Sequence, residues 1–178
     1  YTGDYYDAFG ENWGPRTNGQ PVKVFNSNGA AVPFEAAPDN VRNFFQTGVS
    51  TNNNVSISHA DENGDFRFSG TQLNRRGIVP NTDLNRNTLQ TSMGKKLFNN
   101  RLEFRANAMY VGSSSDNVPN AGYDESSSVM YSFLWLPRNT PIDDLRDYWK
   151  PGQENVQQSY VEELWGNNPW LIVNENTN

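Results

Sequence analysis

Few side chains in this sequence could carry out chemistry. His59 is the only histidine, and no serine and aspartate are placed so as to complete a catalytic triad with it. It continues the apolar face of a predicted strand and is interpreted as a residue at the strand end. Asp61, Glu62 and Asp65 surround an Asn-Gly pair and could suggest a calcium loop, but the ligand spacing of an EF-hand is absent.

The remaining candidates are Asp143, Asp144 and Asp147, because a glycosidase needs a pair of carboxyl groups. Thr140-Pro141 precedes them and is typical of a helix start, where the positive end of the helix dipole stabilises acidic side chains. The chain contains no cysteine, no phosphate-binding loop and no basic cluster. The sequence therefore predicts no enzyme, no cofactor and no metal site.

The clearest predicted secondary structure lies between Asn52 and Val111, and the rest of the chain is organised around it. Residues 52–60 and 65–73 contain alternating apolar and polar side chains on either side of Asn63-Gly64. An Asn-Gly pair between alternating runs predicts a hairpin with a type I′ turn, in which both central residues have a positive φ.

A second predicted hairpin joins residues 87–97 to residues 101–111 through a tight turn at Asn99-Asn100. Its last strand has a period of two, so one face should meet water and the other an apolar partner, which is either a second sheet or lipid. The two faces carry Leu102, Phe104, Ala106, Ala108 and Tyr110 on one side and Arg101, Glu103, Arg105 and Asn107 on the other.

Strand length helps to choose between these two partners. A tilted strand that spans a membrane needs about 9–11 residues, an uncharged outward face and an aromatic residue near the boundary. Residues 101–111 fit this description, with Tyr110 near one end. Residues 87–97 fit less well, because Lys95 shares a face with the apolar residues of that strand.

The predicted connections also differ in length. The turns at Asn63-Gly64 and Asn99-Asn100 are tight, whereas residues 74–85 and the chain after Val111 form long connections. Short turns on one side and long loops on the other are typical of outer-membrane barrels. A soluble sandwich has no reason to sort its loops in this way.

Composition excludes several classes of protein. The chain has 178 residues, a net charge of −6 and a pI of about 4.7, which argues against nucleic acid as a partner. Hydrophobic residues make up 35%, which is low for a chain with a large core of its own. No apolar run approaches the ~18 residues of a membrane helix.

The flanking regions are expected to be loops that contain short helices. Residues 40–45 form a short amphipathic segment that begins after Pro38-Asp39. A helix is predicted to start with Thr140 as its N-cap and to place Ile142, Leu145 and Trp149 on one face.

Two further segments follow in the C-terminal region. A second helix is predicted from Glu154 to Trp165, before Gly166. Trp170 to Val173 is predicted as the only strand of this region. Helices inside a long loop need a surface to pack on, so this region is predicted to be a folded cap.

Several segments resemble the SusC/RagA family of TonB-dependent outer-membrane transporters. They lie in the order of the family and together span nearly the whole chain. The segments are Glu11–Arg16, Asn43–Asn52, Arg76–Asn87, Met130–Arg138, Asn168–Trp170 and Val173–Asn176.

The resemblance implies an all-β fold in which antiparallel hairpins form part of a large transmembrane β-barrel with helix-containing extracellular loops. It divides the chain into an extracellular loop region at 1–50, four barrel strands in two hairpins at 51–112, and a large extracellular loop at 113–178 that could lead into the next strand. Since four or five strands cannot close and transporters of this kind have 22, the chain is expected to be a fragment of the early barrel. The plug and the segment that TonB engages are expected elsewhere.

The function that the resemblance implies is uptake of oligosaccharides or peptides across the outer membrane of a Gram-negative bacterium. The implied partners are a SusD-like surface lipoprotein that acts as a lid, TonB through parts of the chain not present here, and outer-membrane lipid. Glu103, Arg105 and Asn107 are the predicted lumen-facing residues. The loop candidates for contact with ligand or lid, for which packing within the loop is the alternative role, are Trp13, Arg16, Trp135 and Arg138.

Two other functions remain open at this point. A soluble, secreted carbohydrate-binding β domain would stack sugar rings on Trp13, Trp135 and Trp149. It would fold in water and bind glycan without detergent. A cell-surface glycan hydrolase would use Asp143 and Asp147 and would show turnover that is lost on Asp→Asn changes there.

Overall fold

The computed structural model describes residues 16–25, 27–118, 120–124, 127–161 and 166–175. The chain separates into two compact units. The sheet unit comprises residues 47–78 and 82–116, and the loop unit comprises residues 1–46, 79–81 and 117–178. The described secondary structure is mostly β, with antiparallel sheets and a few short helices, so the predicted all-β class is confirmed at this level.

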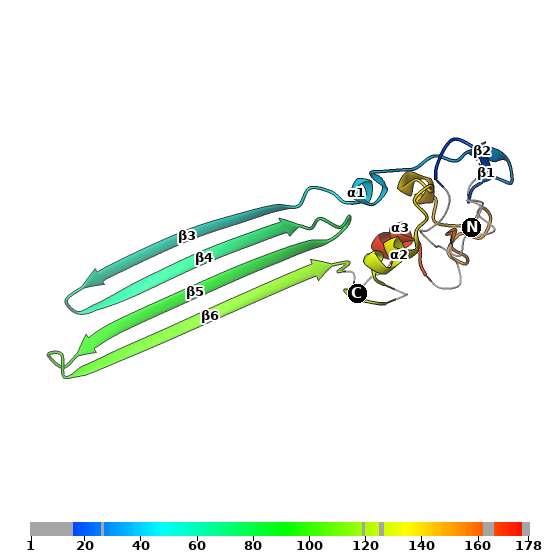
Figure 1. Cartoon of the computed structure of the whole chain (residues 1–178). Helices are drawn as coiled ribbons and strands as arrows, with labels where there is room; N and C mark the ends of the chain where they lie inside the picture. The colour runs from blue at the N-terminus through cyan, green and yellow to red at the C-terminus, as the bar shows by residue number, and fades with distance from the viewer. Residues whose placement is uncertain (1–15, 26, 119, 125–126, 162–165, 176–178) are drawn as a thin grey trace. The chain divides into compact units, whose positions relative to one another are not determined.

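The sheet unit is a single antiparallel sheet of four strands in the order β3-β4-β5-β6, which lie side by side in Figure 1. The strands are longer than the sequence predicted. Backbone pairing continues through polar residues at the strand ends, so the predicted loop at 74–85 shortens to the residues between Arg76 and Asp83. The bounds are β3 Val49–Asp61, β4 Gly64–Arg76, β5 Asp83–Leu97 and β6 Leu102–Asp116.

The first hairpin is present, but the predicted type I′ turn at Asn63-Gly64 is wrong. Asp61 pairs with Gly64, so Glu62 and Asn63 are the turn residues, and neither Asn63 nor Gly64 has a positive φ. The Asp61 carboxylate accepts hydrogen bonds from the N–H groups of Asn63 (2.7 Å) and Gly64 (2.9 Å). Aspartate in the first position and glycine in the fourth are typical of a type I turn.

The second hairpin turns where the sequence predicted, with a less regular backbone. Phe98, Asn99 and Asn100 all have positive φ values, of 54°, 52° and 64°. Asparagine tolerates this region, whereas phenylalanine adopts it at a cost. Arg101 belongs to the turn and not to the strand, because its N–H donates to the Phe98 carbonyl and β6 begins at Leu102.

The loop unit is built from short elements around an aromatic core. They are β1 Pro21–Lys23, β2 Ala31–Pro33, α1 Asn40–Phe44, α2 Val129–Trp135, the 3-10 helix η2 Ile142–Leu145 and α3 Pro169–Glu175. The ring centroid of Phe44 lies 5.0 Å from that of Phe133 and 4.7 Å from that of Trp170. These contacts join α1, α2 and α3, which are far apart in sequence.

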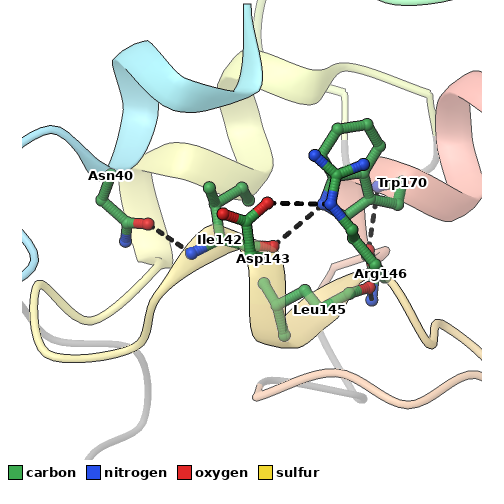
Figure 2. A network of polar contacts seen from close by, with 7 residues as sticks. Asn40, Ile142, Asp143, Leu145, Arg146 and Trp170 are labelled. Atoms are coloured by element: carbon green, nitrogen blue, oxygen red, sulfur yellow. Dashed lines mark hydrogen bonds and ion pairs between the residues drawn. The ribbon is translucent and has the colours of Figure 1, made fainter.

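Buried polar contacts connect the same elements (Figure 2). The Asn40 side chain accepts a hydrogen bond from the Ile142 N–H, and the Trp170 Nε1–H donates to the Ile142 carbonyl at 2.9 Å. The Arg146 guanidinium lies 4.1 Å from the centre of the Trp170 ring and donates to Asp143 at 2.8 Å. The network fixes η2 between α1 and α3.

The structure confirms some of the predicted helices and corrects others. The helix after Asp39 is present as α1. Thr140 is not an N-cap: Pro141 precedes η2, without a side-chain cap, and the helix is one short 3-10 turn. Ile142 and Leu145 are buried as predicted. Thr140 is buried and its carbonyl accepts from Asn40, which the sequence pattern did not indicate.

The helix predicted from Glu154 to Trp165 is wrong over the described residues 154–161, and residues 162–165 lie outside the described part. The segment folds back through an isolated bridge between Trp149 and Gln158, and Val156 is 81% exposed. A helix there would need Val156 against a core. Its exposure shows that this face has no such surface in the described structure.

The strand predicted at Trp170–Val173 is also wrong, because this segment lies inside helix α3. Asn168 precedes the helix and its Oδ1 accepts from the Trp170 N–H, while Pro169 occupies the first helical position. Helix α2 was not predicted; Ser128 caps it by accepting from the Tyr131 N–H. In the described residues, no helix has both the length and the apolar character to cross a membrane.

Candidate functional site

The candidate site is the four-stranded sheet, whose two faces differ in chemistry. Residues paired directly across an antiparallel ladder lie on the same face, and the printed register places Ile57, Phe68, Thr91 and Ala108 in one row. The apolar face defined by this register carries Val55, Ile57, Phe66, Phe68, Leu89, Met93, Leu97, Leu102, Phe104, Ala106, Ala108 and Tyr110.

This apolar face is uncovered in the described structure. Val55 is 78% exposed and Phe104 is 53% exposed, although both would be expected inside a soluble domain. On β6 the apolar run from Leu102 to Tyr110 measures about 26 Å at the rise of an extended strand. An exposed apolar surface of this extent marks an interaction with lipid or with another protein.

The opposite face is polar. It carries serine, threonine, asparagine and glutamine along most of its length, together with charged residues from β4, β5 and β6. Glu103, Arg105 and Asn107 lie on this polar face, on the side opposite to Phe104. The alternation predicted for this strand is therefore present in the sheet.

A charged cluster crosses three strands of the polar face. The Arg105 guanidinium lies 2.7 Å from the Glu103 carboxylate and 3.7 Å from that of Asp65. Gly94 lies between Asp65 and Arg105 in the register, and a Cβ added there would come within 2.5 Å of the Asp65 Oδ1. The glycine thus leaves the space in which these side chains meet. Since all three side chains are substantially exposed, the cluster orients side chains more than it stabilises the fold.

Both edges of the sheet are open in the described residues. There, β3 pairs only with β4, and β6 pairs only with β5. Each outer edge presents unpaired backbone N–H and C=O groups along 13 or 15 residues. Long, unpaired edges of this kind are suited to pairing with further strands.

The predicted loop residues do not form a common site in the described structure. Trp13 lies outside the described residues, and Arg16 and Arg138 are exposed. Trp135 ends α2, and its buried Nε1–H has no hydrogen-bond partner among the residues that the structure describes. Among the described residues, no hydrogen bond or ion pair joins Arg16, Trp135 and Arg138 to one another.

The residues considered for catalysis are placed as structural or surface groups. The exposed His59 Nε2 lies 3.8 Å from the Asp61 carboxylate, and the Asp143 carboxylate accepts a hydrogen bond from Arg146. Asp147 is exposed. No group of three histidine, aspartate or glutamate side chains that could hold a metal ion occurs in the searched, described residues.

In one titratable pair of the loop unit, Tyr148 and Glu175, the pKa of the tyrosine is shifted. Burial raises the pKa of Tyr148, and the hydrogen bond to the Glu175 carboxylate (3.0 Å) together with its negative charge raises it further. The pair connects the segment after η2 to the end of α3. Both residues belong to the loop unit, so the pair joins two segments within that unit.

Sequence reasoning missed one group on the polar face. Leu73 and Arg75 of β4 and Leu84 and Arg86 of β5 lie on this face, where most neighbours are small and polar. The sequence does not indicate this group, because it predicts a loop over residues 74–85, which include Arg75 and Leu84. The available signal was the period of two in Leu73/Arg75 and in Leu84/Arg86, which is the spacing of same-face residues in a strand.

Neither a known family model nor a curated protein matches this chain.

Proposed function

We propose that this chain is part of the wall of a TonB-dependent outer-membrane importer of the SusC/RagA type. Its four long strands would cross the bilayer as part of a barrel, with the apolar face toward lipid and the polar face toward the lumen. The observation that carries this proposal is the uncovered apolar face, whose large side chains are 39–78% exposed, on strands of 13 to 15 residues.

The dimensions of the strands support the proposal. At about 3.3 Å per residue these strands are about 43–50 Å long, which at a tilt of about 45° covers the roughly 30 Å hydrocarbon core. The apolar run on β6 is close to the height of about 25 Å that is typical of the lipid-facing band. Tyr110 lies at one end of that run, where aromatic residues anchor a barrel strand.

The open edges support the same proposal. An unpaired edge cannot lie within lipid, because no water is present to satisfy its backbone groups. In a closed barrel, further strands of the same protein would pair with β3 and β6. The lengths of the connections also agree with a barrel. The short turns after β3 and β5 would be periplasmic, and the longer segments before β3, between β4 and β5 and after β6 would be extracellular.

The resemblance supplies the rest of the proposal. The importer would take up oligosaccharides or peptides, work with a SusD-like lipoprotein as its lid, and receive energy from TonB through another part of the protein. The loop unit, by its position in the chain order, would belong to the extracellular side. No bond is made or broken in the substrate.

The test uses single cysteines, because these 178 residues contain none. In the full-length protein, with any cysteine elsewhere first replaced, Ile57→Cys and Ala106→Cys report on the apolar face. Ser58→Cys and Asn107→Cys report on the polar face. Each is labelled with a nitroxide, and its collision rates with oxygen and with a water-soluble nickel chelate are measured in outer membranes.

We expect the labels at Ile57 and Ala106 to collide with oxygen and to be shielded from the nickel chelate. The labels at Ser58 and Asn107 should show the reverse. Equal access of the nickel chelate to all four positions, in a protein that is soluble without detergent, would contradict the proposal and favour a soluble carbohydrate-binding domain.

A further inference from the structure

Two leucines and two arginines form a square on the polar face of the sheet. In the register, Leu73 faces Arg86 and Arg75 faces Leu84, so the leucines occupy one diagonal and the arginines the other. Diagonal neighbours of an antiparallel pair are about 7–8 Å apart, within reach of long side chains. We call these four residues the Leu–Arg block.

The block borders a groove at the end of the sheet where β3 begins and β4 ends. The groove has a volume of about 410 Å³, and Leu73, Leu84 and Arg75 of the block line it together with Arg76 and Ile78. Both leucines are half-buried and both arginines of the block are exposed. The groove therefore has an apolar floor with cationic groups at its margin.

The arginines of the block have no acidic partner in the described residues. Within the described part of the chain, no ion pair forms at Arg75, Arg76 or Arg86, and the side-chain hydrogen bond of Arg86 runs from Nε to the Ser113 hydroxyl at 3.0 Å. The terminal guanidinium nitrogens that bind carboxylates in a two-pronged manner are thus available.

The polar face as a whole has an excess of positive charge. The strands place five cationic residues on it and only two acidic ones, Asp65 and Glu103, both of which are held by Arg105. This excess occurs in a chain whose net charge is −6. Neighbouring guanidinium groups without a counter-charge repel each other, and a bound anion would relieve that repulsion.

We propose that the Leu–Arg block is a binding site for a carboxylate that adjoins an apolar group. The guanidiniums of Arg75 and Arg86 would hold the carboxylate while Leu73 and Leu84 contact the apolar group. A neutral sugar would leave both charges uncompensated. Two sources offer this chemistry: the free C-terminus of a peptide that ends in an apolar residue, and a short fatty acid.

This inference deepens the proposed function, because in the barrel the block would face the lumen near its extracellular end and would select among cargoes. The test uses the full-length protein in detergent micelles, with binding measured by titration calorimetry. The probes are acetyl-Ala-Ala-Leu with a free carboxylate, the same peptide with a C-terminal amide, and hexanoate.

We expect the peptide acid to bind about tenfold or more tightly than the amide, because charge-assisted hydrogen bonds to Arg are lost in the amide. The Arg75→Gln/Arg86→Gln double variant should lose a similar factor. Arg67→Gln is the matched control, since Arg67 is an unpaired arginine on the same strand and face but lies away from the leucines. It should bind as the unaltered protein does.

Hexanoate that binds as tightly as the peptide acid would support the block and assign a fatty acid as the source. Equal binding of acid and amide by the unaltered protein would overturn the inference, and so would an equal loss in Arg67→Gln. If the protein needs detergent to stay in solution but binds none of the probes, the proposed binding site at the Leu–Arg block is contradicted and the proposed barrel is not. If it binds the peptide acid but is soluble without detergent, the proposed barrel is contradicted and the binding site is not.

Discussion

Asn168 shows at the residue scale how one buried amide can join segments that are distant in sequence. Its Nδ2 donates to the carbonyls of Leu145 (2.8 Å) and Ser159 (2.9 Å), and its Oδ1 accepts from the Trp170 N–H (2.9 Å). The residue is fully buried. All three of these hydrogen bonds are made within the loop unit. A buried polar side chain is tolerated when it is hydrogen-bonded in this way.

Asn168→Ala should therefore destabilise the loop unit by about 2–3 kcal/mol, because it leaves buried carbonyl and N–H groups without partners. Amide hydrogen exchange of α3 in the full-length protein measures the loss. Asn174→Ala is the control: Asn174 is exposed and its side chain accepts one hydrogen bond, from Asn81. Equal protection of α3 in both variants would show that the buried contacts contribute little.

The Tyr148–Glu175 pair gives a prediction about pH. The pKa of Tyr148 is raised above its ordinary value of 10.0. The stability that the protonated Tyr148 side chain contributes is therefore complete below pH 10.0 and is lost as the pH rises through the raised pKa. Glu175→Gln removes the charge but leaves the burial, which is the larger cause. The pKa of Tyr148, followed by phenolate absorbance with Tyr148→Phe as the blank, should fall in this variant but stay raised. An unchanged pKa would mean that Glu175 has no influence.

At the scale of the elements, successive side chains of the four strands alternate between an apolar and a polar face of the sheet. Phe104 faces one side of β6 and Asn107 the other. The sequence pattern alone predicted this alternation, because it needs only the extended backbone. The lengths of the strands were underestimated, since asparagine and serine at strand ends resemble loops until their backbone groups are seen to pair.

Phe104→Arg and Asn107→Arg form a matched pair on β6. In the proposed barrel, Phe104→Arg should cost about 2–4 kcal/mol if it lies near the bilayer midplane, whereas Asn107→Arg should cost much less because it meets water. Reversible unfolding of the full-length protein in lipid vesicles measures both. Equal costs would mean that the two faces have been assigned wrongly.

The first hairpin gives a second prediction at this scale. A Cβ on Gly64 would overlap the Gly94 carbonyl, so the strands must separate in Gly64→Ala, at a cost of about 1–3 kcal/mol. In Gly70→Ala the new Cβ meets only the Leu89 side chain, at an ordinary 3.6 Å. The same unfolding measurement should show almost no loss for Gly70→Ala. A comparable loss in both variants would indicate a general effect of removing glycine.

At the scale of the whole molecule, the two units differ in where their apolar residues lie. The described core cluster, which includes Phe44, Phe133 and Trp170, belongs to the loop unit. The sheet unit contributes no residue to that cluster and exposes its apolar face. The loop unit thus has a core of its own, whereas the large apolar side chains of the sheet face are exposed.

The 178-residue chain should accordingly be insoluble or aggregated in detergent-free buffer and should be dispersed by a mild detergent. The reason is the uncovered apolar face together with two open edges. Sedimentation with and without detergent, combined with the intact mass, measures this. A folded 20.1 kDa monomer in plain buffer would contradict the prediction and would exclude a lipid-facing role for the sheet.

The two hairpins, the two-faced strands and the short helix before β3 can be predicted from the sequence, because they follow from local periodicity and turn residues. The helical conformation of Trp170–Val173 depends on long-range contacts, since a run of four apolar residues suits a strand as well as a helix until its packing partners are known. Asn168 as a cap and Phe44 as a neighbour decide that choice. The Leu–Arg block likewise depends on which residues of β4 and β5 face each other, and this register comes from long-range backbone pairing.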